Sequence, residues 1–246
     1  MGGRGLALIR ARFGVMATRV GYWVGALLFA SGLFHLLVFF VDGGPWEGPV
    51  SWRKPVTFGL TLATFVWVGT LVRIKPFVVA LFTVVSVYEV LGITVQAWRK
   101  VPSHFNTETP FDVVVTGGLA VGGGVIIFCV VWLMVTAWRA SHLTPSMLLA
   151  VRVGTATFLS AMAFGAVMIA RGSVLSRSGR LAEAYSTAGF FKPAHGVAMH
   201  GILLLPVLAW LLTFTSLDER ARTRVVAGAS AVYVLLVGAA VWVSLG

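Results

Sequence analysis

The sequence predicts an all-α integral membrane protein, a bundle of about seven transmembrane helices. Of its 246 residues, 58% are apolar and 11% are charged, whereas a typical soluble domain has roughly 45–50% apolar and about 25% charged residues. A long chain this poor in charge cannot cover its surface with water-compatible side chains. Seven spans of about 20 residues each would use most of the chain, so we expect no soluble domain.

The first three apolar runs end at charged or helix-breaking residues. A span over residues 20–41 ends at Asp42, which Gly-Gly-Pro follows, and Gly and Pro stop helices. A second span over 55–72 begins with a proline, which suits the first position of a helix. A third span over 77–98 ends at Arg99, where the loop that is richest in polar residues begins.

Four further runs complete the predicted bundle. They cover residues 111–138, 147–170, 194–217 and 225–245, and a longer loop over 171–193 separates the fifth from the sixth. Ahead of the first span, several arginines flank short apolar runs, which predicts a basic segment lying on anionic lipid. The predicted domains are therefore an interfacial segment, 1–19, and one transmembrane domain, 20–246.

The net charge of +11 does not indicate nucleic-acid binding, because Lys and Arg sit at span ends and in loops, where membrane proteins place them. A small excess of Lys and Arg predicts a cytoplasmic N-terminus, and an odd number of spans then places the C-terminus outside. Cys129 is the only cysteine, which excludes an internal disulfide.

Polar residues gather towards one face of this predicted bundle. Alternating connectivity places the first, third and fifth loops on the same side of the membrane, whichever way the protein is inserted. Those loops and the adjoining helix ends hold His35, Asp42, Glu47, Arg53, Lys54, Glu89, Gln96, Arg99, His104, Asn106, Glu108, Asp112, Lys192, His195 and His200.

Three of these residues lie at similar depths inside the bilayer. At a rise of 1.5 Å per residue, His35, Glu89 and His200 are roughly 9, 13 and 10 Å below the ends of their spans. Ionisable groups at such depth are costly and are usually paired or functional. Two histidines and a carboxylate suit zinc or non-haem iron, so we predict these three as metal ligands. The alternatives are a haem b held by the two histidines, or a hydrogen-bonded or proton-relay cluster.

Three further residues are candidates for catalysis. His104 or His195 would act as acid or base, and Gln96 follows Glu89 by seven residues, so both share one helix face with Val85. His195 and His200 are about 140° apart around a helix and would face one point only if the turn after Pro193 were unwound.

A rim of four cations, Arg53, Lys54, Arg99 and Lys192, is predicted above this cluster. The rim would hold haem propionates, an anionic lipid headgroup, or a carboxylate or phosphate substrate. The alternative is anchoring at the membrane surface together with tryptophans. Close by, Thr109 is expected to cap the fourth span.

The polar segments resemble those of a known but uncharacterised family of bacterial multi-pass membrane proteins. The resemblance rests on Ser51 to Pro55 (SWRKP), Pro102 to Asn106 (PSHFN), and Lys192 to His195 (KPAH) followed by Met199 and His200. It covers most of the chain and implies no activity. The chain also has a fainter similarity to the seven-span zinc hydrolases of the alkaline ceramidase and adiponectin-receptor group. Their paired histidines are three residues apart, unlike His195 and His200.

Three functions follow from these patterns. The first is a membrane-embedded, metal-dependent hydrolase or oxidoreductase that acts on a lipid or another hydrophobic substrate. The second is a b-type haem protein that exchanges electrons with a quinone. The third is a proton- or cation-coupled transporter or sensor, in which Glu89 and the histidines bind the ion.

Overall fold

The structure, a computed structural model, describes the backbone of residues 3–246 and the side chains of residues 12–60 and 63–246. The predicted basic segment therefore lies partly outside the described residues, which include no side chain for Arg4 or Arg10. Within the described residues the regular structure is entirely α-helical, without strands, which confirms the predicted fold class. α1 (Gly3–Asp42) runs as one helix across the predicted boundary between residues 19 and 20.

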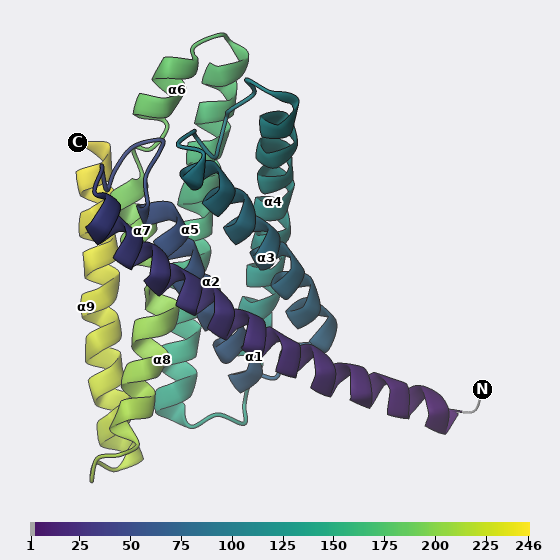
Figure 1. The fold of residues 1–246 in the computed structure, drawn as a ribbon. Coiled ribbons are helices and arrows are strands. Elements are labelled where there is room, and N and C mark those ends of the chain that lie inside the picture. The colour runs from purple at the N-terminus through teal and green to yellow at the C-terminus, as the bar shows by residue number, and fades with distance from the viewer. Residues whose placement is uncertain (1–2) are drawn as a thin grey trace.

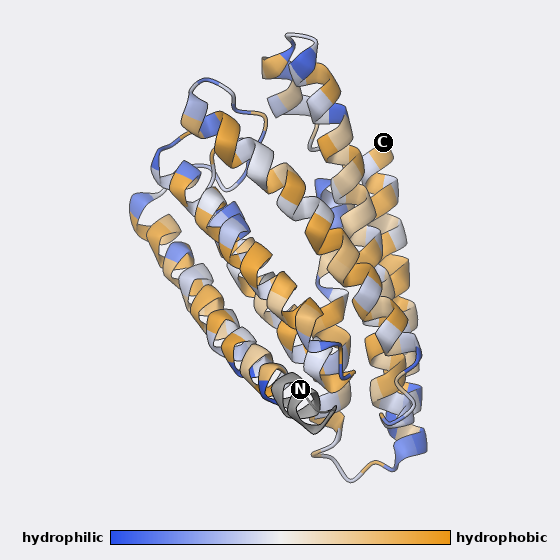
Figure 2. Cartoon of the chain, turned by 90° about the vertical axis from the view of Figure 1, so that its right-hand side faces the viewer, coloured by the Kyte–Doolittle hydropathy of each residue, from blue (hydrophilic) through white to orange (hydrophobic). Residues whose placement is uncertain are grey.

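The remaining helices follow the predicted order (Figure 1). They are α2 (Arg53–Leu71), α3 (Pro76–Trp98), α4 (Pro110–Trp138), α5 (Pro145–Arg177), α6 (Leu181–Thr187), α7 (Lys192–Met199), α8 (Gly201–Leu212) and α9 (Glu219–Leu245). Six segments among the described residues are long and apolar enough to cross a membrane, namely Arg12–Asp42, α3, α4, α5, Lys192–Leu212 and α9. The protein is therefore an integral, multi-pass membrane protein. Hydrophobic residues lie along the helices and hydrophilic ones gather towards the ends (Figure 2).

The second predicted span is the exception. α2 forms the expected helix of 19 residues but is not among the six candidate spans. Its first turn contains Arg53 and Lys54, and threonines and glycines recur along it, which makes it less apolar than an ordinary span. Among the residues that the structure describes, six of the predicted spans are therefore supported by length and composition.

Two ends of the bundle are distinguished by their loops (Figure 1). We call one end of the bundle the site end. It holds residues 43–52, 99–109 and 178–191 together with the C-terminus. The opposite end holds the start of α1 and the α4–α5 and α8–α9 connections. The predicted loop over 171–193 is partly helical, because α5 continues to Arg177 and α6 follows.

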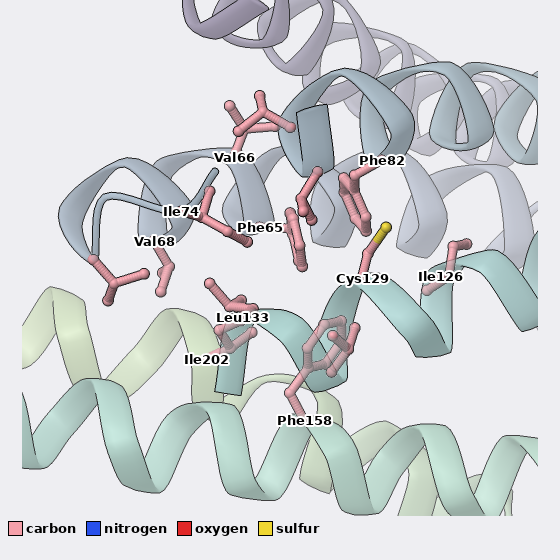
Figure 3. Close-up of a cluster of buried hydrophobic side chains, with 14 of the residues drawn as sticks. Phe65, Val66, Val68, Ile74, Phe82, Ile126, Cys129, Leu133, Phe158 and Ile202 are labelled. Atoms are coloured by element: carbon pink, nitrogen blue, oxygen red, sulfur yellow. The ribbon is translucent and has the colours of Figure 1, made fainter. Parts of the chain in front are cut away.

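A cluster of buried apolar side chains joins the helices below the site end. Phe65 from α2 stacks on Phe82 from α3, and Cys129, Leu133, Phe158 and Ile202 extend the cluster into α4, α5 and α8 (Figure 3). This packing holds α2, α3 and α4 against each other, and the site end is built where these helices begin or end.

The sixth predicted span is interrupted at His200, between α7 and α8. The hydroxyl of Tyr233 on α9 donates a hydrogen bond to the carbonyl oxygen of Val197. The backbone N–H of His200 donates to the same oxygen, with a distance of 3.3 Å. A side chain that takes over a helix carbonyl in this way is an established cause of a kink.

Candidate functional site

The predicted gathering of the SWRKP, PSHFN and KPAH segments is seen in direct contacts at the site end. Lys54 Nζ from the first segment donates a hydrogen bond to Ser103 Oγ from the second, with a distance of 3.2 Å. Lys192 Nζ from the third lies 3.3 Å from Glu47 Oε2, next to the first segment. Three stretches that are far apart in the chain therefore form one surface.

Lys54 is the centre of a hydrogen-bonded chain. Its ammonium also donates to the carbonyl oxygen of Pro49, at 2.8 Å, and Ser103 Oγ lies 2.9 Å from His104 Nδ1. Burial, followed by the positive charges of Arg53 and Lys192, lowers the pKa of Lys54 from 10.5 to about 8. A substantial fraction of Lys54 is thus the neutral amine at mildly alkaline pH.

His104 stays neutral beside this lysine. Burial of the ring, followed by the charge of Lys54, lowers the pKa of His104 from 6.5 to about 3. A neutral imidazole has one donor and one acceptor nitrogen, so Nδ1 can either accept from Ser103 or donate to it. His104 therefore contacts the Ser103 hydroxyl without adding charge.

A small cavity lies near Ser103, but the space that Ser103 itself lines is too narrow to hold a water molecule. A cavity of about 100 Å³ is lined by Asp42, Gly43, Gly44, Pro45, Val50, Ser51, Trp52, Ala97 and Lys100. A narrower space beside it shares Val50, Ser51 and Ala97 and is also lined by Lys54 and Ser103. Ser51 is 6% exposed, and among the described residues its hydroxyl has no hydrogen-bond partner. A buried, unpaired hydroxyl is costly, and here it lies in the wall that the two spaces share.

The predicted cationic rim divides into three parts. Arg53 Nε and Lys192 Nζ pair with the two carboxylate oxygens of Glu47, at 3.2 and 3.3 Å. Glu47 is 61% exposed, so these ion pairs add little stability but connect the α1–α2 loop to α7. Lys54, in contrast, makes its hydrogen bonds to Pro49 and Ser103.

Arg99 belongs to a separate network between α3 and α4. It donates hydrogen bonds to the side chains of Gln96 and Asp112, and Gln96 Nε2 donates to the same Asp112 oxygen at 2.8 Å. Thr109 caps α4 as predicted, since its hydroxyl oxygen accepts from the backbone N–H of Asp112. Gln96 and Asp112 are almost fully buried and satisfied by this network, which joins the two helices.

The structure does not bring the predicted metal ligands together. Among the residues it describes, no group of three or more His, Cys, Asp or Glu side chains is arranged to hold a metal ion. His35 is buried between tryptophans, with Nδ1 bonded to the Ser31 carbonyl oxygen and Nε2 accepting from Trp98 Nε1. Both of its ring nitrogens therefore have hydrogen-bond partners within the protein.

The other two predicted ligands lie elsewhere. Glu89 is buried on α3 and faces Gly122 on α4. His200 is exposed at the α7–α8 break, where its Nδ1 bonds to the carbonyl oxygen of Gly196. The predicted depths of His35, Glu89 and His200 describe only their positions along the helices. The three side chains point in different directions around their helices, and this difference keeps them apart.

His195 lies apart from the Lys54 chain. Its Nδ1 bonds to the carbonyl oxygen of Ala161 on α5, at 2.7 Å, and its ring packs beside Gly165. This contact docks α7 on α5 within the bundle.

Ser103 and Ser51 are the site residues that the sequence reasoning missed. Both serines belong to the SWRKP and PSHFN segments, but within these segments only the ionisable residues were predicted to be functional. A serine gives no signal by itself, and only the distance between Ser103 and Lys54 distinguishes it.

Comparisons with known proteins give no further identification. No family model, curated protein or solved structure matches this chain. The two resemblances noted from the sequence therefore gain no support from these comparisons.

Proposed function

We propose that this chain is a membrane-embedded serine hydrolase, in which Ser103 is the nucleophile and Lys54 the general base. The observation that carries the proposal is the hydrogen bond of 3.2 Å between Lys54 Nζ and Ser103 Oγ, near a small cavity whose lining includes Ser51 with its unpaired hydroxyl. A base acts best when its pKa lies near the working pH, and the pKa of about 8 at Lys54 meets that condition. The proposed reaction class, hydrolysis, is one that the sequence predicted. The proposed nucleophile differs, because a serine takes the place of a metal-bound water.

The reaction is a transfer of an acyl group. Neutral Lys54 takes the hydroxyl proton as Ser103 Oγ bonds to the carbonyl carbon of an ester or amide. The proton then passes from Nζ to the leaving oxygen or nitrogen as that bond breaks, and the acyl group stays on Oγ. Water, deprotonated by Lys54 in turn, releases the acid and restores Ser103.

Two neighbours assist this reaction in the proposal. His104, a positioning residue, holds the Ser103 hydroxyl in line with Lys54 through their contact of 2.9 Å. The hydroxyl of Ser51 donates to the carbonyl oxygen as negative charge develops there. The site end adjoins the bilayer, so the expected substrate is a lipid or another hydrophobic ester whose apolar part stays in the membrane.

The proposal includes a seventh span, α2. The part of α2 that follows Lys54, residues 55–71, is about 26 Å long at 1.5 Å per residue, close to the roughly 30 Å of a hydrocarbon core. The start of α1 and the end of α9 lie at opposite ends of the bundle (Figure 1), which requires an odd number of crossings between them. With a cytoplasmic N-terminus, the site end faces outside.

The test is labelling of the purified protein in detergent with a fluorophosphonate probe. The serine oxygen forms a bond to phosphorus and fluoride leaves. We expect stoichiometric labelling of the wild type at Ser103, located by peptide mass spectrometry, and its loss in Ser103→Ala. Ser178→Ala, which changes an exposed serine near the same end, should label like the wild type.

Equal labelling of the wild type and Ser103→Ala would overturn the proposal, provided both proteins elute as folded monodisperse species. Metal analysis and a visible spectrum of the same samples test the earlier alternatives. Bound zinc, iron or haem that His35→Ala removes, together with absent labelling, would favour the metal or haem function instead.

A further inference from the structure

Glu89 has no role in the proposed hydrolase, and its surroundings are unusual for a carboxyl group. It lies in the middle of α3 and is 2% exposed. Its Oε1 has no hydrogen-bond partner within the described part of the chain. The nearest feature of α4 is Gly122, where an added Cβ would overlap Oε1. The absence of a side chain at Gly122 therefore makes the space that the carboxyl occupies.

Among the residues whose side chains the structure describes, no cation offsets this carboxyl. The ion pairs between described residues do not include Glu89. The helices packed against α3 are α1, α2 and α4, and their charged or titratable side chains have other partners or lie elsewhere. On the described parts of these helices they are Arg12, Arg19, Tyr22, His35, Asp42, Arg53, Lys54, Asp112 and Cys129.

The nearest of these groups along the bundle are already engaged. Asp112 is bonded to Arg99, His35 to Trp98, and Lys54 to Ser103. Cys129 is buried in the apolar cluster. An ionised carboxylate without a counter-charge inside a membrane protein costs several kcal/mol, which is far more than a neutral acid costs there.

We propose that Glu89 and the space at Gly122 form a proton-binding site inside the membrane, at the contact between α3 and α4. Glu89 holds its proton at neutral pH, and the neutral carboxyl lets the two helices pack closely. Removal of the proton would place an unpaired charge in this contact and separate α3 from α4. The site is independent of Ser103 and Lys54.

Infrared spectroscopy tests this directly, because a protonated carboxylic acid has a C=O stretching band that a carboxylate lacks. We expect the wild type, reconstituted in lipid at pH 7, to show this band and Glu89→Gln to lose it. Gln has nearly the same shape and is neutral, so the helix contact should survive. Transfer to D₂O should shift the band, and the rate of the shift reports how readily the proton exchanges.

Glu183→Gln is the matched control, since Glu183 is a glutamate outside the bundle that pairs with Arg180. It should leave the acid band unchanged. The proposal is overturned if the wild type shows no acid band, or if the band has the same intensity in Glu89→Gln as in the wild type.

Discussion

Lys54 is the residue whose chemistry is most closely determined by its surroundings. Its pKa of about 8 predicts that fluorophosphonate labelling of Ser103 rises with pH and reaches half its maximal rate near pH 8, because only the neutral amine accepts the serine proton. The measurement is the labelling rate across pH 6–10, in about half-unit steps, compared with the same series for Lys54→Arg. Arginine remains protonated over this range, so the variant should lose the pH-dependent rise.

The same shift has a consequence for stability with a defined sign. The folded state holds the Lys54 proton less tightly than the unfolded chain, whose pKa is the ordinary 10.5. Between pH 8 and 10.5 the unfolded state therefore binds more protons, and the contribution of this group to the stability of the folded state increases as the pH rises.

The labelling experiment also has an outcome that would contradict the role of Lys54. If the labelling rate of the wild type does not change with pH, and Lys54→Arg is labelled as fast as the wild type, Lys54 is not the general base.

The elements around the site depend on close helix contacts at glycines. A Cβ on Gly59 of α2 would lie 2.5 Å from the Leu28 carbonyl oxygen of α1, and backbone atoms cannot move aside as a flexible side chain can. Gly59→Ala should therefore destabilise the protein by about 1–3 kcal/mol, as overpacking does elsewhere. Gly117→Ala on α4 meets no atom within 4 Å and is the matched control.

Thermal unfolding in detergent, followed by circular dichroism, checks this prediction. The expected result is a lower midpoint for Gly59→Ala and an unchanged or slightly higher one for Gly117→Ala, since alanine favours helices. If both variants unfold at the wild-type temperature, the α1–α2 contact is looser than its geometry indicates.

The sequence predicted elements better than it predicted side-chain partners. Apolar length identified the membrane helices, and the parity of the loops correctly brought Lys54 and Ser103 to one end. The capping of α4 by Thr109 was also predictable, because a cap is a local interaction within a few residues. The prediction that His35, Glu89 and His200 form one set of ligands was wrong. Such a set depends on how three helices are rotated about their axes and on the break at His200, and neither can be read from the sequence. At that break Tyr233, a distant residue on α9, donates a hydrogen bond to the carbonyl oxygen of Val197.

At the scale of the whole molecule, the arrangement of the spans makes the orientation testable with single cysteines. Cys129, the natural cysteine, is fully buried and should not react with a membrane-impermeant maleimide. Ser178 and Ser141 are exposed and lie beyond the two ends of α5, so α5 would place them on opposite sides of the membrane. Ser178 is at the site end, which the predicted cytoplasmic N-terminus places outside.

Intact cells should therefore allow labelling of Ser178→Cys but not of Ser141→Cys, and permeabilised cells should allow both. The reverse pattern would show that the N-terminus faces outside, and the small excess of basic residues would then be a poor guide to orientation. Labelling of both positions in intact cells would mean that α5 does not span the membrane, in conflict with its length and apolar composition. The reverse pattern, in which only Ser178→Cys is protected, would also place the proposed hydrolase site on the cytoplasmic side, and its substrate would then have to be found there.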